Sequence, residues 1–299
     1  MKLAAIDIGS NAARLLISEV TTDEKHVPSF NKISLVRVPL RLGFNVFDTG
    51  KIPENKKALL LHTMKAYLHL LEANEVKYLK ACATSAMREA SNAQEIIQLV
   101  KNETGIEIEV ISGDDEASFI YENHIAENLD EDHSYLYIDV GGGSTELTFY
   151  SNNNLVFKDS YDIGTIRLLK NKVIDDTWEA LKENIKIKTK GHKQVTAIGS
   201  GGNINKVYSL SKQKDSKPLP LDLLRDFYKE LGSVNLAERM SLYKMREDRA
   251  DVIVPALQIY VNVMRWAGAA EIYVPKIGLA DGLIQHLWQE IEGNKFGDK

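Results

Sequence analysis

The sequence is poor in cysteine, has no long uninterrupted apolar run and carries no excess of basic charge. Its single cysteine, Cys82, excludes an intrachain disulfide framework and any zinc or iron–sulfur site built from several cysteines. Lysine and arginine total 37 against 42 aspartates and glutamates, which gives a net charge of −5. This balance argues against a protein held to nucleic acid by bulk basic charge, although it does not exclude a local basic groove.

The sequence also lacks segments typical of secretion or membrane insertion. The N-terminus reaches Asp7 before any long apolar region can form. The stretches 59–71 and 251–268 contain charged or polar residues, as buried or amphipathic helices do, and are not typical membrane spans. We therefore expect a cytoplasmic protein that binds neither membranes nor nucleic acid.

What is present is an ordinary globular composition at a length that favours two domains. The chain has 299 residues, 44% of them hydrophobic and 26% charged. Domains of about 100–200 residues are usual, and a chain of this length can bury a large core without disulfides.

The order of the predicted elements repeats along the chain. The first set comprises strands at 3–8, 13–20 and 32–42, a helix at 53–74, a strand at 78–84, a helix at 92–102, a strand at 106–111 and a helix at 115–128. The second set comprises strands at 135–140, 145–150 and 155–163, helical segments, a strand at 194–198, further helices, a strand at 271–277 and a final helix at 279–292. The order β-β-β-α-β-α thus occurs twice.

The two sets open on similar sequences, IDIGSNAARLLI and IDVGGGSTELTF. Their spacing is too long for a solenoid repeat and suits two similar α/β domains facing each other across a cleft, a common place for a ligand. We expect an N-terminal domain over 1–128 and a second over 129–282, with the boundary near 127–133. The C-terminal helix, 283–299, is expected to pack back on the first domain.

Both openings place an aspartate at the end of a strand, followed by small residues in a turn. The turns comprise Gly9, Ser10 and Asn11 in the first set and Gly141, Gly142, Gly143 and Ser144 in the second. Glycine allows close backbone approach, and successive N–H groups in a turn can bind an anion such as phosphate. Because phosphate repels a bare carboxylate, Asp7 and Asp139 predict a cation, and Mg²⁺ suits such oxygen ligands. Either turn alone could be a simple hairpin, but the pair in register favours phosphate binding.

A third glycine-rich turn, with Gly201 and Gly202, follows the strand at 194–198. By itself such a turn is weak evidence, because tight packing of a strand against a helix explains it equally well.

These features resemble the actin, Hsp70 and sugar-kinase superfamily and, within it, the Ppx/GppA family of exopolyphosphatases and guanosine pentaphosphate phosphohydrolases. The motifs that carry the resemblance are DIGSN (7–11), ATSAMREASN (83–92), SGDDEA (112–117), DVGGGSTEL (139–147), IGSGGN (198–203) and RADVIVPA (249–256). It implies two ribonuclease H-like, actin-like domains over nearly the whole chain.

The resemblance also implies roles for individual residues. Glu116 matches the catalytic glutamate, Asp139 and Glu146 match the metal site, and Asp7 matches the first phosphate turn. From the residues alone, the acids Asp114, Asp115 and Glu116 could simply complement a helix dipole, with Ser112 as the N-cap. Two positions depart from the family pattern, since Ala12 replaces a hydroxyl residue and Ala280 an arginine. Longer members carry a C-terminal helical domain, so the resemblance does not extend to their long-chain processivity.

Several basic residues have two interpretations. Arg88, and similarly Arg14 and Arg41, could bind phosphate or form structural ion pairs. The lysine-rich stretch 182–193, with Lys170 and Lys172 nearby, could line a groove for an anionic polymer or form an ordinary solvated face. We expect His62, His69 and His124 to be structural and Cys82 to be a buried apolar residue.

The resulting expectation is a Mg²⁺-dependent hydrolase that releases orthophosphate from inorganic polyphosphate, from pppGpp, or from both. Glu116 would activate water, and Arg88 and the three glycine turns would bind phosphate. Two alternatives are an ATP-dependent kinase or ATPase of the same superfamily and a non-catalytic sensor of polyphosphate or (p)ppGpp. A homodimer through the apolar helices near Trp266 is also expected.

Overall fold

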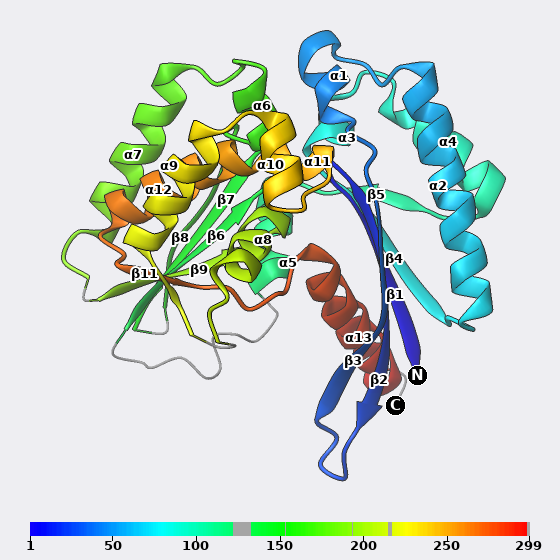
Figure 1. The fold of residues 1–299 in the computed structure, drawn as a ribbon. Coiled ribbons are helices and arrows are strands. Elements are labelled where there is room, and N and C mark those ends of the chain that lie inside the picture. The colour runs from blue at the N-terminus through cyan, green and yellow to red at the C-terminus, as the bar shows by residue number, and fades with distance from the viewer. Residues whose placement is uncertain (122–132, 153, 193, 215–216, 298–299) are drawn as a thin grey trace. The chain divides into compact units, whose positions relative to one another are not determined.

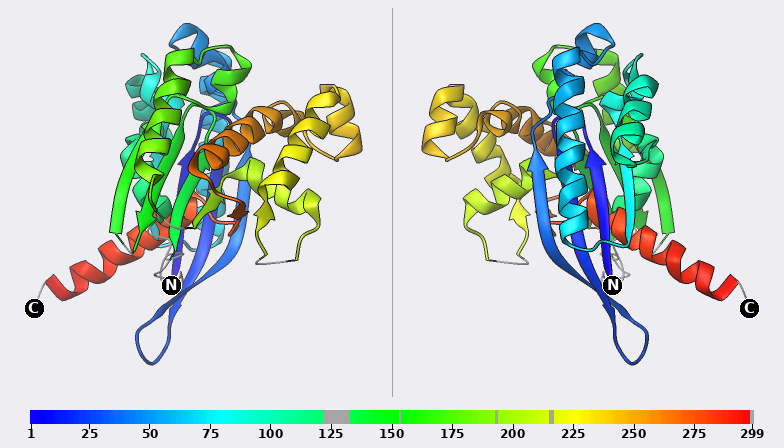
Figure 2. Two further views of the ribbon diagram at one scale, coloured as in Figure 1. Left: turned by 90° about the vertical axis from the view of Figure 1, so that its left-hand side faces the viewer. Right: turned by 90° about the vertical axis from the view of Figure 1, so that its right-hand side faces the viewer.

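A computed structural model describes residues 1–121, 133–152, 154–192, 194–214 and 217–297. The chain forms two compact units, unit 1 (Met1–Asn123 and Gly278–Lys299) and unit 2 (His124–Ile277). Each unit has its own mixed sheet with helices packed against it (Figures 1 and 2). No helix in the described ranges combines the length and the apolar character needed to cross a bilayer.

The sheet of unit 1 has the order β3-β2-β1-β4-β5. Its strands are β1 (Lys2–Ile8), β2 (Ala13–Thr22), β3 (Pro28–Val38), β4 (Tyr78–Ala83) and β5 (Ile108–Val110). The first three are antiparallel neighbours, whereas β4 pairs with β1 and β5 in parallel. The turns that follow β1 and β4 therefore lie at the same edge of the sheet, where the Thr84 N–H donates to the Ile8 carbonyl at 3.1 Å.

Helices cover both faces of this sheet (Figure 1). They are α1 (Gly43–Thr49), α2 (Glu54–Ala73), α3 (Ser85–Glu89), α4 (Ala93–Thr104), α5 (Gly113–Tyr121) and α13 (Leu279–Gly297). Although α13 is the last helix, it contacts β1, β2, β4 and α5. Its residues Leu283 and Ile284 share a core with Leu3 and Ala5 of β1. The C-terminal segment thus completes the core of the N-terminal unit.

Unit 2 has the sheet order β10-β11-β9-β6-β7-β8. Its strands are β6 (Ser134–Val140), β7 (Thr145–Ser151), β8 (Asn154–Tyr161), β9 (Val195–Ser200), β10 (Leu219–Pro220) and β11 (Glu271–Tyr273). Its helices are α6 (Thr165–Leu169), α7 (Asp175–Thr189), α8 (Gly202–Ser211), α9 (Leu221–Ser233), α10 (Leu236–Leu242), α11 (Glu247–Ala250) and α12 (Ile253–Ala267). As in unit 1, β6 is antiparallel to β7 and parallel to β9.

The core of unit 2 is built around α12, which contacts α6, α7, α8, α9 and β6. At its C-terminal end Trp266 packs edge-to-face on Trp178 of α7, with ring centroids 5.8 Å apart. This ring therefore has a packing role within the unit, and a homodimer through these helices stays a prediction.

Some element boundaries differ from the sequence prediction. The third strand ends at Val38 rather than at 42, because Pro39 lacks the N–H that a strand ladder uses and Arg41 adopts a left-handed φ of 56°. Strand β11 is shorter than predicted, and the short helices α1 and α3 were not predicted. The predicted helix end at 122–128, His124, the boundary at 127–132 and Lys193 lie outside the described residues.

Cys82 is buried in β4 and burial raises the pKa of its thiol to about 12, so the prediction of a buried apolar residue is confirmed.

Candidate functional site

Each unit closes the turn after its first strand in the same way. The Gly9 N–H donates to the Ala12 carbonyl at 3.0 Å, and the Gly141 N–H donates to the Ser144 carbonyl at 3.0 Å. Positions 9–12 and 141–144 are therefore structurally equivalent turns on equivalent hairpins.

The carbonyl groups of both turns face the segment that follows the third strand. In unit 1, the Ser10 carbonyl accepts from the Gly43 N–H at 2.9 Å and the Asn11 carbonyl accepts from the Arg41 N–H at 2.8 Å. In unit 2, the carbonyls of Gly141 and Gly142 accept from the N–H groups of Thr165 at 3.1 Å and Ile166 at 2.8 Å. In a trans peptide the C=O and N–H groups point in opposite directions, so the N–H groups of these peptides point away from that segment. Such a series of N–H groups suits an anion.

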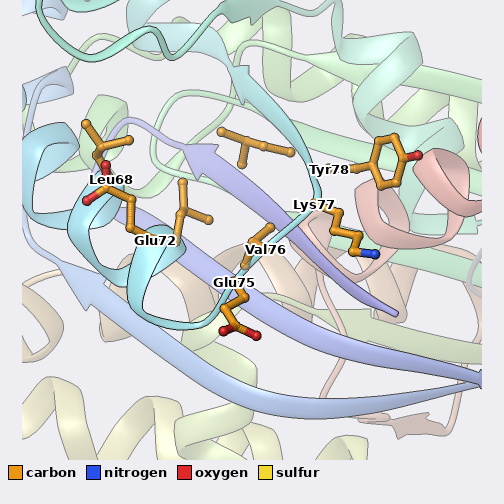
Figure 3. Close-up of a pocket in the computed structure, with 8 residues that line it drawn as sticks. Leu68, Glu72, Glu75, Val76, Lys77 and Tyr78 are labelled. Atoms are coloured by element: carbon orange, nitrogen blue, oxygen red, sulfur yellow. The ribbon is translucent and has the colours of Figure 1, made fainter.

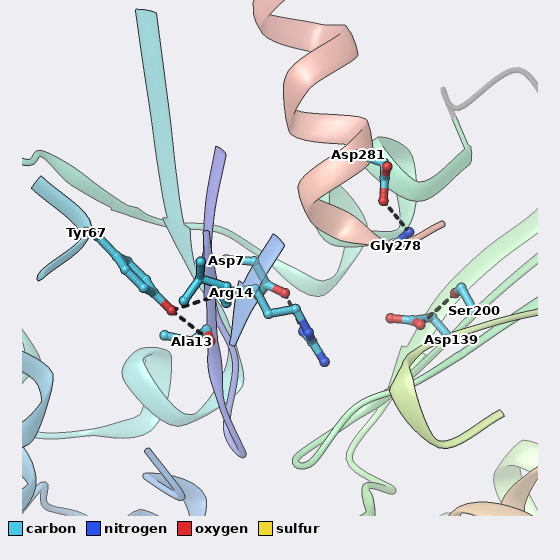
Figure 4. A network of polar contacts seen from close by, with 9 residues as sticks. Asp7, Ala13, Arg14, Tyr67, Asp139, Ser200, Gly278 and Asp281 are labelled. Carbon is cyan, nitrogen blue, oxygen red and sulfur yellow. Dashed lines mark hydrogen bonds and ion pairs between the residues drawn. The ribbon is translucent and has the colours of Figure 1, made fainter. Parts of the chain in front are cut away.

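The two hairpins differ in the residue directly opposite the strand-end aspartate. In unit 1, Asp7 pairs with Arg14 across β1 and β2, and the Arg14 Nη1 lies 2.5 Å from the Asp7 carboxylate (Figure 4). The buried Asp7 charge is therefore neutralised within its own hairpin, which leaves it poorly suited to hold a metal.

In unit 2, the equivalent position opposite Asp139 is occupied by Glu146. A carboxylate oxygen of Asp139 and one of Glu146 lie within 4.8 Å of each other, and Glu146 is only 2% exposed. The Ser200 hydroxyl donates to Asp139 Oδ1 at 2.6 Å (Figure 4), and the Ser160 hydroxyl donates to Glu146 Oε1 at 2.9 Å.

Two carboxylates facing each other across a strand pair repel, and this repulsion is costly where one of them is buried. A hard divalent cation would remove the repulsion, and carboxylate oxygens are the ligands that Mg²⁺ prefers. The donor set of Asp139 and Glu146 therefore fits Mg²⁺, and the metal role that the family resemblance implies for these two residues stays a prediction.

The third glycine turn lies at the end of β9, next to this carboxylate pair. Gly201 has a φ of 106°, and a Cβ there would lie 3.3 Å from Asp139 Oδ1. The Tyr260 hydroxyl of α12 donates to the Ser200 carbonyl, and burial, with the nearby Asp139 charge, raises the pKa of Tyr260 well above its ordinary value. Tyr260 thus holds the strand end that orients Ser200 toward Asp139.

Gly202 is the first residue of α8 and lies against the guanidinium group of Arg249, a residue that the sequence motifs do not assign to the site. A Cβ at Gly202 would lie 2.6 Å from Arg249 Nη2, and Arg249 Nη1 donates to Asn203 Oδ1 at 2.7 Å. The small residue at position 202 therefore lets the Arg249 guanidinium approach the backbone closely, and a larger residue there would displace it.

The acidic residues at the start of α5 have different surroundings: Asp115 takes part in the helix cap, and Glu116 is buried. Ser112 and Asp115 form reciprocal contacts, with the Ser112 hydroxyl donating to Asp115 Oδ2 at 2.6 Å and the Asp115 N–H donating to Ser112 Oγ at 3.1 Å. Asp114 and Asp115 are exposed, whereas Glu116 is only 8% exposed. The capping explanation therefore applies to Asp115, whereas Glu116 is distinguished by its burial.

Arg88 has a contact with the backbone just before α5. Its Nη1 donates to the Ile111 carbonyl at 2.8 Å, so it fixes the residue that precedes the Ser112 cap. Nearby, the hydroxyl groups of Ser10 and Ser85 lie 2.7 Å apart and link the first turn to α3. Phosphate binding by Arg88 stays a prediction, since a guanidinium has further donors to offer.

Other basic residues lie on surfaces. Lys186, Lys188 and Lys190 are exposed at the C-terminal end of α7, so the described part of the 182–193 stretch can be explained as a solvated face. The Arg41 guanidinium lies 3.9 Å from the centroid of the Phe44 ring. A polymer-binding groove stays a prediction.

An open pocket in unit 1 lies where α2 ends and β4 begins (Figure 3). It is lined by Leu68, Leu71, Glu72, Glu75, Val76, Lys77, Tyr78 and Leu79. Tyr78 pairs with Leu3 at the start of β1, so the pocket is at the opposite end of these strands from the Asp7 turn. Its lining includes none of the predicted site residues.

The chain was compared with known sequences. The pattern that defines the Ppx/GppA phosphatase family matches residues 20–290. Exopolyphosphatase 1 of Mycobacterium bovis is 28% identical over 179 residues, which cover 59% of this chain and 50% of that protein. The bifunctional 3-dehydroquinate synthase/phosphatase of Fusobacterium nucleatum is 32% identical over 191 residues, which cover 62% of this chain and 29% of that protein. The matched regions thus span half or less of these relatives.

Solved structures match over almost the whole chain. An exopolyphosphatase from Cytophaga hutchinsonii has a TM-score of 0.82 at 25% identity and covers 98% of both chains. The Ppx/GppA family member of Aquifex aeolicus has a TM-score of 0.74 at 26% identity and covers 97% of this chain and 98% of that one. These matches confirm the predicted α/β class with two actin-like domains. Together with the family pattern, they establish that the chain belongs to the Ppx/GppA phosphatase family.

Proposed function

We propose that the protein hydrolyses a terminal phosphoanhydride bond and releases orthophosphate from the end of inorganic polyphosphate, from the 5′ end of pppGpp, or from both. The observation that carries the proposal is the Asp139–Glu146 pair on the hairpin whose turn presents backbone N–H groups. A divalent cation beside an anion-binding turn is the combination that phosphoryl transfer requires. The relatives named exopolyphosphatase support polyphosphate as the substrate class.

The glycine turns would bind the phosphate groups. In unit 2 the N–H groups of Gly142, Gly143 and Ser144 would contact phosphoryl oxygens, while the Gly141 N–H closes the turn and Gly201 and Gly202 allow close approach. In unit 1 the N–H groups of Ser10 and Asn11 would do the same, while Gly9 closes the turn and allows close approach, with Arg88 as a further donor. Because Arg14 neutralises Asp7, this first turn can face an anion without a metal.

Asp139 and Glu146 would hold Mg²⁺. When bound, the ion neutralises negative charge on the phosphate chain and stabilises the charge that develops on the leaving oxygen. Glu116 would act as the general base: its carboxylate orients the attacking water and accepts the proton that the water loses as the phosphorus–oxygen bond forms.

The test compares substrates under one set of conditions. The full chain is incubated with Mg²⁺ and, separately, polyphosphate, pppGpp or ATP, and both phosphate release and binding are measured. We expect release from polyphosphate, from pppGpp, or from both at rates well above that from ATP. Turnover of ATP alone would instead indicate a kinase-like ATPase, and tight binding of pppGpp or polyphosphate without release would indicate a sensor.

The carboxylate pair gives a prediction that is independent of turnover. In the presence of a chelator, Glu146→Gln should raise the free energy of unfolding by about 0.5 kcal/mol, because it removes the repulsion with Asp139. In contrast, the wild type should gain thermal stability on addition of Mg²⁺ and the variant should gain little, since binding to the native state alone stabilises it.

Thermal unfolding of both proteins with and without Mg²⁺ measures the effect. Glutamine retains an oxygen that can accept from Ser160, so this contact is preserved. Equal stabilisation of both proteins by Mg²⁺ would contradict the assignment of Glu146 as a ligand.

A further inference from the structure

We propose that Arg167 is a positioning residue for the turn Gly141–Ser144. Its guanidinium contacts the carbonyl side of the turn and thereby orients the N–H groups of the turn toward a phosphoryl group. The proposal rests on the proposed function of the turn and adds a residue that the family motifs quoted above do not include.

The contacts of Arg167 are made to the turn itself. Its Nε donates to the Gly143 carbonyl at 2.6 Å, and its backbone N–H donates to the Gly142 carbonyl at 3.4 Å. The side chain is only 11% exposed, and its Nη2 also lies 3.3 Å from Asp162 Oδ1. One residue thus engages two consecutive carbonyls of the turn.

The contact with Gly143 has an electronic consequence as well as a geometric one. The Gly143 carbonyl and the Ser144 N–H belong to the same peptide group. A hydrogen bond from a charged donor to the carbonyl polarises that peptide, which makes its N–H a stronger donor toward an anion. Arg167 therefore places positive charge on the carbonyl side of the turn without occupying the space on its N–H side.

Tight packing next to Arg167 leaves the turn little freedom. A Cβ at Gly164 would lie 2.4 Å from the Gly142 oxygen and 2.4 Å from the Gly143 carbonyl carbon. The backbone at 164 is thus in direct contact with the turn, and the chain from Gly164 to Arg167 forms a close-fitting support.

At the equivalent position in unit 1 the donor is a backbone group. Asn11 corresponds to Gly143, and its carbonyl accepts from the backbone N–H of Arg41, whose guanidinium lies over the Phe44 ring. In unit 2 the Gly143 carbonyl accepts from a charged side chain, whereas in unit 1 the Asn11 carbonyl accepts from a backbone N–H. This difference in the donor at equivalent positions supports a role for Arg167 beyond holding the fold.

The test uses Arg167→Met and Arg167→Lys, with Asp162→Asn as the matched control. Asp162 is 73% exposed and contacts the same guanidinium from the solvent side. Measurements are kcat and KM for polyphosphate with Mg²⁺, the inhibition constant of orthophosphate, and the melting temperature. If Arg167 only stabilised the fold, replacing it would reduce the melting temperature and the active fraction. It would leave the orthophosphate inhibition constant of the folded enzyme unchanged.

For Arg167→Met we expect kcat to fall about tenfold to a hundredfold and the orthophosphate inhibition constant to rise about tenfold, because the turn donors lose their alignment. Arg167→Lys should show a smaller change in both, about threefold, because an ammonium group lacks the planar fork of guanidinium. Asp162→Asn should resemble the wild type.

Arg167→Met with wild-type kcat and inhibition constant would overturn the inference while leaving the proposed function intact. If Arg167→Met does not fold, wild-type values for Arg167→Lys would overturn it. A wild-type protein that neither releases nor binds phosphate would overturn the proposed function, and the inference with it.

Discussion

Glu116→Gln should release phosphate from polyphosphate about 10²–10⁴ times more slowly than the wild type, with little change in KM. Glutamine has nearly the same shape as glutamate but cannot accept the proton of the attacking water. The substitution leaves the helix cap intact, because the cap is formed by Ser112 and Asp115 rather than by Glu116.

Asp114→Asn is the matched control for this experiment. Asp114 lies two residues before Glu116 in the first turn of α5, carries the same charge and is exposed. Rates are measured by phosphate release with saturating Mg²⁺, and folding is checked by thermal unfolding. Substantial activity in Glu116→Gln, or an equal loss in Asp114→Asn, would rule out Glu116 as the general base.

Gly282→Ala should produce a large loss of stability. A Cβ at position 282 would lie 1.8 Å from the Phe119 carbonyl oxygen, and this obstacle is backbone that cannot change rotamer. Helix α13 would have to move away from α5. We expect a loss of roughly 3 kcal/mol, at the upper end for overpacking, which corresponds to a fall in melting temperature of roughly 6–12 °C.

The same helix provides the control, Gly293→Ala. Gly293 is exposed on α13, and a Cβ there meets no atom within 4 Å. Alanine should therefore raise stability by about 0.5–1 kcal/mol through its higher helix propensity. Urea unfolding of both variants measures the contrast, and similar stabilities would show that the close contact with Phe119 is not required.

Gly282→Ala should also lower activity, because α5 carries Glu116 one helical turn before Phe119. The effect would appear mainly in kcat, since a displaced base weakens the chemical step more than substrate binding.

Much of the fold could be predicted because its signals are local. The apolar runs at 3–8 and 135–140, each ending in an aspartate and small residues, indicated both the central strands and the duplication. Boundaries were less accurate where a single backbone feature ends a strand, as at Pro39, and where a helix is too short to show periodicity, as in α1 and α3.

Only those parts of the candidate site that lie within short sequence motifs could be predicted. The sequence placed Asp7 and Asp139 in equivalent turns, but the different partners Arg14 and Glu146 became clear only from the strand register. The motif SGDDEA contains three acids, and the burial of Glu116 alone distinguishes them physically. The support given by Arg167 to Gly143 joins residues 24 positions apart, so no local pattern could have revealed it.

The asymmetry between the two hairpins suggests how a duplicated unit can acquire two tasks. Each hairpin closes its turn with the same backbone hydrogen bond, from the Gly9 N–H to the Ala12 carbonyl in one copy and from the Gly141 N–H to the Ser144 carbonyl in the other. One side chain on the returning strand differs: position 14 places an arginine opposite the first strand-end aspartate, whereas position 146 places a second carboxyl group opposite the other. Under the proposed function, the choice of residue at that single position would decide whether the copy receives an anion directly or first requires a cation.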